Sequence, residues 1–187
     1  MSLVPLHETH LSLGAKMGPF GGWDMPIEYT AGTVAEHTAV RTAVGIFDVS
    51  HMGKVRILGD GAYAFANSMF TNDMDRIKPG QAQYSMLCND TGGVIDDLIV
   101  YLVSDEEVRF IPNAGNASTV VAHLEKVAPS GIVIENNHLK QGIIAVQGPN
   151  ASKVVSALGL PTDHDYMAFA DAKWNGFDVS ICRTGYT

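Results

Sequence analysis

The 187-residue sequence has little cysteine. Cys88 and Cys182 are the only two, and neither lies in a Cys-x-x-Cys or Cys/His spacing. Because zinc sites need closely spaced thiolate and imidazole ligands, the sequence predicts no metal site. Such sparse cysteine use is compatible with a reducing compartment, and we expect a cytoplasmic protein.

Basic residues are also scarce. Lysine and arginine total 12 against 20 acidic residues, which gives a formal net charge of -8. Binding to a phosphate backbone needs a basic surface, so this balance argues against nucleic acid as a partner. No apolar run approaches the roughly 20 residues needed to span a bilayer, so we expect no membrane partner either.

What is present is typical of a globular α+β protein. Hydrophobic residues make up 46% of the chain and charged residues 17%, and the length suffices to bury a core. Between residues 54 and 134 the periodicity predicts strand, helix, three strands, helix and strand. That order indicates a ferredoxin-like unit with an antiparallel sheet and packed helices on one face.

The flanking segments are too short to form a second independent core. We therefore expect a split first domain, residues 1–52 plus 138–187, which is incomplete, and an inserted second domain, residues 53–137. Residues 17–26 hold glycines and prolines, which predict a turn-rich loop anchored by Phe20 and Trp23. A helix from about Thr33 to Val44 is expected to bury Val34 and Val40.

The most informative stretch is Gly92–Tyr101, an apolar strand pattern that carries Asp96 and Asp97 side by side. Adjacent residues on a strand point to opposite faces, so the two carboxylates cannot share one role. At least one should face packed protein, where an unpaired carboxylate is costly. Either that group is paired within the protein, or it contacts a ligand such as a polar heterocycle.

Asp48, Ser50 and His51 contain the residue types of a nucleophilic triad, but their spacing does not support one. Ser50 and His51 are neighbours in a predicted strand, so their side chains point apart. The simpler interpretation is a set of polar residues that satisfy backbone groups at the end of a strand. Phe20 and Trp23 could stack on a ring system, although loop anchors are the more common use of such residues.

Several longer sequence motifs, taken together, indicate a protein family more specifically than any single motif does. The chain strongly resembles the N-terminal part of the aminomethyltransferase family, the T-protein of the glycine cleavage system. The matching words, in chain order, are Gly22-Trp23-Asp24-Met25-Pro26-Ile27-Glu28-Tyr29, Gly45-Ile46-Phe47-Asp48-Val49-Ser50-His51-Met52, Gly92-Gly93-Val94-Ile95-Asp96-Asp97-Leu98-Ile99-Val100-Tyr101, Val146-Gln147-Gly148-Pro149 and Thr184-Gly185-Tyr186-Thr187.

The resemblance implies a three-domain fold around a cavity for tetrahydrofolate, with the first domain split by the second. It implies transfer of an aminomethyl group from the lipoyl arm of H-protein, giving 5,10-methylenetetrahydrofolate and ammonia. By resemblance Asp96 is the key acid and Asp97 faces the other way. If Asp97 faces the cavity instead, the role moves by one residue. The residues that the resemblance places at the folate pocket are Met52, Tyr84, Asp96, Tyr101, Asn113 and Tyr186.

The main departure from the family is the end of the sequence at Thr187, because the family motif continues and supplies further folate contacts. We therefore expect a truncated chain that binds folate weakly or not at all and catalyses poorly. Two alternatives share the fold. One is a folate-dependent demethylase, or the folate domain of an enzyme that oxidises sarcosine or dimethylglycine. The other is a folate-binding accessory protein of iron–sulfur assembly, whose cysteine-containing motif is absent here.

Overall fold

The computed structural model describes residues 1–185 and divides the chain into two compact units. The inserted unit comprises Met52–Gln141 and His164–Ala170. The split unit comprises Met1–His51, Gly142–Asp163 and the segment from Asp171 to the last described residue. Tyr186 lies outside the described residues. Within residues 1–185, no helix is long and apolar enough to cross a membrane.

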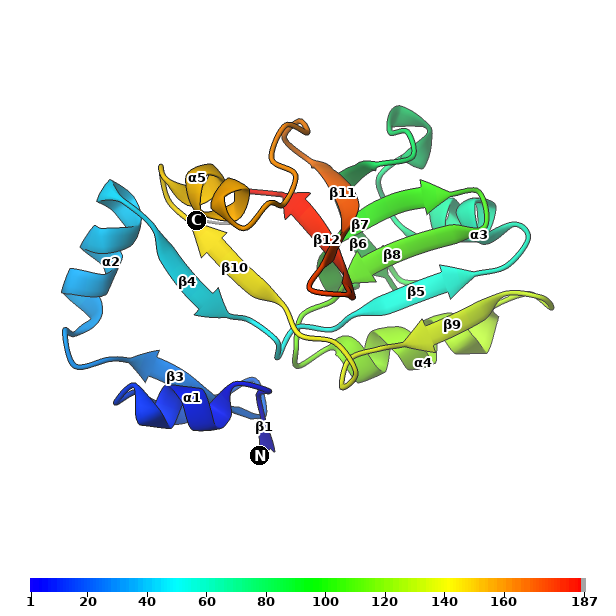
Figure 1. Cartoon of the computed structure of the whole chain (residues 1–187). Coiled ribbons are helices and arrows are strands. Elements are labelled where there is room, and N and C mark those ends of the chain that lie inside the picture. Colours follow the sequence, from blue (N-terminus) through cyan, green and yellow to red (C-terminus); the bar gives the residue numbers. More distant parts are fainter. Residues whose placement is uncertain (186–187) are drawn as a thin grey trace. The chain divides into compact units, whose positions relative to one another are not determined.

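The inserted unit is built on an antiparallel sheet whose strands follow the order β6-β7-β8-β5-β9 (Figure 1). The strands are β5 (Val55–Leu58), β6 (Gln81–Cys88), β7 (Val94–Ser104), β8 (Glu107–Ile111) and β9 (Val133–Asn136). Strands β5, β7, β8 and β9 alternate with helices as a split βαβ unit does, and β6 extends the sheet beyond β7. The predicted α+β class, with an antiparallel sheet and packed helices, is confirmed.

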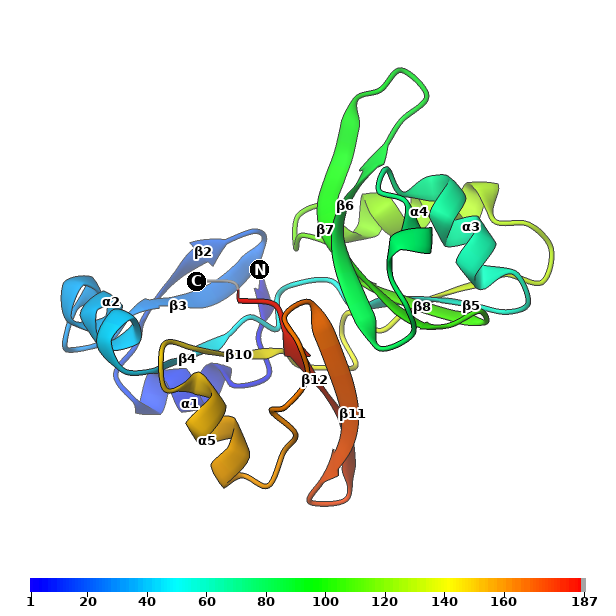
Figure 2. The same ribbon diagram turned by 90° about the horizontal axis from the view of Figure 1, so that it is seen from above.

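Two helices, α3 (Ala62–Met69) and α4 (Ala117–Val127), cover one face of this sheet (Figure 2). Alternate strand residues point toward the helices and form the core with them, because the side-chain period of a strand is two. Each fully buried aliphatic side chain of such a core contributes about 1.5–3 kcal/mol. The largest fully buried side chains of this core are Phe110, Ile57, Met74, Leu87 and Leu124.

The opposite face of the same sheet is here called the open face, because neither α3 nor α4 covers it. Tyr84 pairs with Ile99 across β6 and β7, and Met86 pairs with Asp97. Since alternate residues share a face, Tyr84, Asp97 and Ile99 all lie on the open face. The strand β11 (Ala168–Trp174) pairs with the edge of β6 through Ala168 and Gln81, and its residue Phe169 packs against Tyr101 on this face.

The split unit contains smaller sheets and short helices. Strands β1 (Ser2–Leu3), β3 (Trp23–Glu28) and β2 (Lys16–Phe20) form one sheet, and β4 (Gly45–Asp48) pairs with β10 (Ile144–Gln147). Its other elements are α1 (His7–Ser12), α2 (Thr33–Thr42), α5 (Ala151–Ala157) and β12 (Phe177–Arg183), which neighbours β11. Among the described residues of this unit, Val4, Trp23 and Met25 are the only buried apolar side chains.

Two expectations about the split unit were wrong. Residues 17–26 form a hairpin of β2 and β3 rather than a loop, because Gly21 and Gly22 supply the two positive φ angles of its tight turn, 57° and 88°. Helix α2 is present, but none of its residues is buried, and Val34 is 79% exposed. Its apolar residues therefore do not contribute to a core within the described residues.

The contrast between the two units gives a stability prediction. Ile57→Val should lower the free energy of unfolding by roughly 0.5–1.5 kcal/mol, because Ile57 is fully buried and loses one methylene. Val34→Ala should change it by less than about 0.5 kcal/mol, because this side chain is exposed. Urea unfolding followed by far-ultraviolet circular dichroism measures both, and a larger loss for Val34→Ala would contradict the described packing.

Candidate functional site

The two adjacent carboxylates of β7 lie in different environments. Asp96 is 2% exposed and shares a face with the buried Leu98, whereas Asp97 is exposed on the open face. The alternation expected from the sequence is therefore present in β7. The structure also adds what alternation alone could not provide, namely the partners of each carboxylate.

Asp96 is held entirely by protein donors. The backbone N–H of Asn113 donates to Asp96 Oδ2 at 2.8 Å. Two side-chain amides donate to Asp96 Oδ1, from Asn113 Nδ2 at 3.0 Å and from Asn116 Nδ2 at 2.7 Å. Burying a carboxylate is costly without such bonds, and hydrogen bonds to a charged acceptor are the strong ones. Asp96 therefore links β7 to residues 112–116, the segment between β8 and α4.

Asp97 has partners that leave it accessible. The hydroxyl of Tyr84 donates to Asp97 Oδ2 at 2.5 Å, and Asn113 Nδ2 lies 3.2 Å from Asp97 Oδ1. Tyr84 is itself 52% exposed. The hydrogen bond to Asp97 raises the pKa of Tyr84 above its usual value, because ionising the phenol would remove that bond beside a negative charge. Asp97, Tyr84 and Asn113 thus form a polar cluster that a ligand could reach from the open face.

The structure brings together four of the residues expected at the pocket or beside it, and places the others elsewhere. Asn113, Tyr84, Asp96 and Asp97 are connected by the hydrogen bonds just described. Tyr101 shares the open face with Asp97 but lies four residues along β7, which corresponds to about 13 Å.

The remaining residues expected at the pocket do not join the cluster of Asp97, Tyr84 and Asn113 in the described residues. Tyr101 is only 7% exposed and packs edge-on against Phe169, with 5.6 Å between ring centroids. Met52 is half-buried and precedes β5, a strand separated from β7 by β8. Tyr186 was expected at the pocket and lies outside the described residues.

Sequence reasoning missed Asn116. An asparagine at the start of a helix is ordinarily an N-cap. In the structure the Asn116 side chain caps no backbone N–H of α4 and donates to Asp96 instead. The available signal was the spacing of two asparagines, Asn113 and Asn116, around the start of a helix that follows a carboxylate-bearing strand.

Asp48, Ser50 and His51 do not assemble a nucleophilic triad. Asp48 Oδ1 accepts the backbone N–H of Ser50 at 2.9 Å, and its Oδ2 lies 3.1 Å from Nε2 of the buried His10. Ser50 Oγ accepts the backbone N–H of Ile143 at 3.0 Å. Burial by itself would raise the pKa of Asp48, but the hydrogen bonds from Ser50 and His10 outweigh it and lower that pKa. These groups serve local structure.

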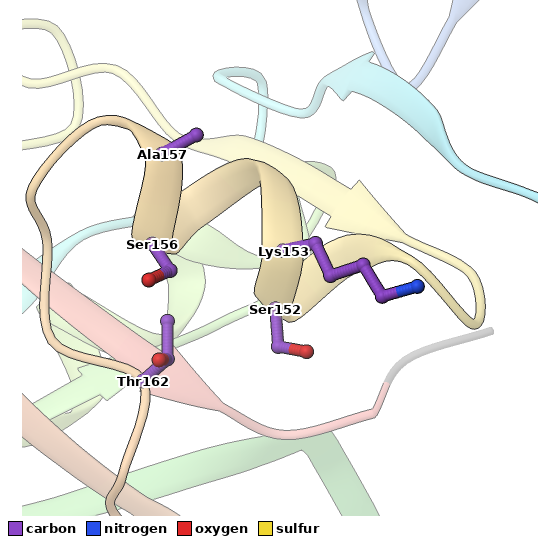
Figure 3. Close-up of a pocket in the computed structure, with 5 residues that line it drawn as sticks. All are labelled: Ser152, Lys153, Ser156, Ala157 and Thr162. Carbon is purple, nitrogen blue, oxygen red and sulfur yellow. The ribbon is translucent and has the colours of Figure 1, made fainter.

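A shallow depression on α5 is lined by Ser152, Lys153, Ser156, Ala157 and Thr162 (Figure 3). Ser156 and Thr162 point toward each other, whereas the Lys153 side chain extends away from them (Figure 3). Lys153 is the one charged residue of this lining, and none of the expected pocket residues belongs to it. Within residues 1–185, no three His, Cys, Asp or Glu residues are grouped so as to hold a metal ion.

Comparison with known proteins identifies related chains. The family model described as the GCVT N-terminal domain matches residues 6–187. The aminomethyltransferases of Frankia alni and Mycobacterium tuberculosis H37Rv are 56% identical over 184 residues and 55% identical over 183 residues. Each alignment covers 98% of this chain and 50% of the relative, so the chain spans about half the length of these curated relatives.

Two solved structures share the fold. A crystal structure of glycine cleavage system aminomethyltransferase T from Bartonella henselae superimposes with a TM-score of 0.85 at 35% identity. The match covers 90% of this chain and 46% of that one. A heterotetrameric sarcosine oxidase from Corynebacterium sp. U-96 gives a TM-score of 0.54 at 13% identity over 82% of this chain and 78% of that one. The second similarity concerns the fold alone.

The difference between the two carboxylates predicts different costs of removal. Asp96→Ala should lower the free energy of unfolding by roughly 3 kcal/mol, because it strips buried amide donors of a charged acceptor. Asp97→Ala should cost less than about 1 kcal/mol, because solvent can replace its partners. Chemical denaturation at neutral pH compares the two, and equal costs would show that Asp96 is not the structural member of the pair.

The lowered pKa of Asp48 predicts a pH dependence of stability. An acid whose folded-state pKa is depressed stabilises the fold above its unfolded pKa of about 3.9, and this contribution is lost as pH falls through the folded value. Asp48→Asn should therefore be less stable than wild type at pH 7, and the difference should shrink below about pH 4. Urea unfolding at a series of pH values tests this. Parallel pH profiles for the two proteins would contradict it.

Proposed function

Because this chain belongs to the GCVT N-terminal domain family, we propose that it takes part in tetrahydrofolate-dependent aminomethyl transfer from the lipoyl arm of H-protein. The predicted resemblance to the aminomethyltransferase family is confirmed, and the curated relatives are aminomethyltransferases. The proposed products are 5,10-methylenetetrahydrofolate, ammonia and dihydrolipoyl H-protein. Folate and lipoylated H-protein are the proposed partners.

The proposal rests on one observation, the accessible cluster of Asp97, Tyr84 and Asn113 on the open face. Tetrahydrofolate supplies two amine nitrogens, each of which loses one hydrogen as the methylene bridge forms. One of these hydrogens leaves with ammonia and the other ends on the released sulfur, so the reaction needs no oxidant. A fixed carboxylate beside such an amine orients it and accepts its proton.

The geometry favours Asp97 over Asp96 for this contact. Both oxygens of Asp96 already accept amide hydrogens, and the side chain is buried. A ligand could reach Asp96 only by displacing donors that stabilise the fold. Asp97 is exposed, and its neighbours Tyr84 and Asn113 offer a hydroxyl and an amide that could read the polar edge of a pterin. We therefore assign to Asp97 the role that the resemblance gave to Asp96.

The rest of the expected pocket stays a prediction. We propose that Tyr101, which lies on the same face beside Phe169, and Met52 and Tyr186 supply the apolar contacts with the ring. We also propose the domain division expected from the sequence, a first domain of residues 1–52 plus 138–187 that is split by residues 53–137. The cytoplasmic location likewise stays a prediction. Because the curated relatives are about twice as long, we expect these 187 residues by themselves to transfer slowly.

Replacing single carboxylates tests the proposed reaction. With aminomethylated H-protein and tetrahydrofolate, Asp97→Asn should lower the rate of methylenetetrahydrofolate formation by about 100-fold or more, the usual contribution of a proton-transferring group. Asp60→Asn removes an exposed carboxylate elsewhere in the inserted unit and should leave the rate unchanged.

The outcomes separate the competing assignments. Equal rates for wild type and Asp97→Asn would remove Asp97 from the mechanism. A larger loss for a folded Asp96→Asn would return the role to Asp96. Binding of tetrahydrofolate without any transfer would favour the alternative of a folate-binding accessory protein, whereas transfer from an N-methylated amine would favour a demethylase.

A further inference from the structure

The side-chain amide of Asn113 lies between the two carboxylates and has too few hydrogens for its surroundings. Its Nδ2 is 3.0 Å from Asp96 Oδ1, 3.2 Å from Asp97 Oδ1 and 2.9 Å from the backbone oxygen of Asp97. A primary amide carries two hydrogens, so three acceptors must share them. The strength of the hydrogen bond from Asn113 Nδ2 to the Asp97 carboxylate therefore depends on how many hydrogen bonds Asp96 accepts from other donors.

Asn116 is the other residue whose side-chain amide donates a hydrogen bond to Asp96. Its Nδ2 lies 2.7 Å from the same Oδ1 that Asn113 approaches at 3.0 Å, so the Asn116 contact is the shorter of the two. Although Asn116 precedes α4, its side chain caps none of the helix N–H groups. Asn116 Nδ2 thus donates to a carboxylate that does not itself face the open surface.

We propose that Asn116 is a positioning residue for Asp97. Because Asn116 donates a hydrogen bond to Asp96 Oδ1, the amide hydrogens of Asn113 remain available to Asp97. Asn113 then holds one oxygen of the Asp97 carboxylate while Tyr84 holds the other. The carboxylate is thereby fixed in a single orientation on the open face. The benefit of this orientation for folate binding rests on the proposed function, whereas the positioning itself does not.

Removing Asn116 has a definite expected consequence. In Asn116→Ala the buried carboxylate of Asp96 loses its shortest hydrogen bond and draws the Asn113 amide toward itself. Asp97 then keeps one anchor, the half-exposed Tyr84, and its carboxylate rotates more freely. A larger fraction of the molecules should lack the Tyr84–Asp97 hydrogen bond.

The phenol of Tyr84 reports on that hydrogen bond without any ligand. Asp97 raises its pKa, chiefly through the bond itself, and Asp96 adds a smaller charge effect. Tyrosine labelled with carbon-13 at Cζ gives one signal for each residue, and the Tyr84 signal is identified by its loss in Tyr84→Phe. Its pKa in Asn116→Ala should fall toward the ordinary value of about 10. Asp97→Asn should remove the larger part of the shift and so calibrates the measurement.

The matched control is Asn150→Ala. Asn150 also precedes a helix, α5, and its side chain likewise caps no backbone N–H. The pKa of Tyr84 in this variant should equal that of wild type. A Tyr84 pKa that is unchanged or raised in Asn116→Ala, while it falls in Asp97→Asn, would overturn the proposal. That result would mean that solvent replaces Asn116 at Asp96.

If Asn116→Ala does not fold, a double variant in which the residue types at positions 96 and 116 are exchanged, here called the reversed pair, tests the proposed positioning. Combining Asp96→Asn with Asn116→Asp restores an amide–carboxylate contact between the two positions. The amide oxygen introduced at position 96 can still accept the backbone N–H of Asn113. Asn113 Nδ2 then has no carboxylate at position 96 to serve, so Tyr84 should keep its raised pKa. A fall of this pKa in the folded reversed pair would contradict the proposed positioning.

Tetrahydrofolate binding separates this inference from the proposed function. If both hold, the dissociation constant should rise about tenfold in Asn116→Ala, equivalent to about 1.4 kcal/mol, and stay unchanged in Asn150→Ala. If wild type binds no tetrahydrofolate but the Tyr84 pKa falls in Asn116→Ala, the positioning role stands and the proposed function fails. If wild type binds tetrahydrofolate and the Tyr84 pKa does not fall, the positioning role fails alone.

Discussion

The buried carboxylate of Asp96 is the constraint on which the candidate site depends. A charge placed among the apolar residues of a sheet needs several donors, and β7 alone cannot provide them. Residues 112–116 bring the backbone N–H of Asn113 and two side-chain amides to Asp96. The same contacts fix where Asn113 lies, and through Asn113 they reach the exposed face of β7. A structural bond on one face thus sets the geometry of polar groups on the other.

The sequence predicted the inserted unit well because its elements are strongly periodic. The order expected between residues 54 and 134, strand, helix, three strands, helix and strand, appears as β5, α3, β6, β7, β8, α4 and β9. Local signals were weaker in the split unit. Glycines and prolines in residues 17–26 suggested a loop, although Gly21-Gly22 between two aromatic residues is a tight-turn signal. The apolar residues of α2 predicted burial, but periodicity cannot show whether another surface exists to cover them.

The candidate site shows where sequence reasoning reaches its limit. Alternation in β7 established that Asp96 and Asp97 point to opposite faces, which needs no knowledge of the rest of the chain. The partners of the buried carboxylate, Asn113 and Asn116, lie 17 and 20 residues further along the chain. No local pattern encodes such a contact. Asn116 was overlooked for the same reason, since a residue before a helix is ordinarily interpreted as a cap.

The location of the polar cluster also has a physical reason. The inserted unit contains the large apolar core, whereas the described residues of the split unit bury few apolar side chains. A carboxylate that must hold one orientation is best placed on a strand whose other face is packed, because the backbone beneath it cannot yield. Asp97 and Tyr84 lie on such strands. On the opposite face of these strands Leu87, Asp96 and Leu98 are buried. Thus the packing that stabilises the sheet also provides the rigid base that a ligand-orienting carboxylate needs.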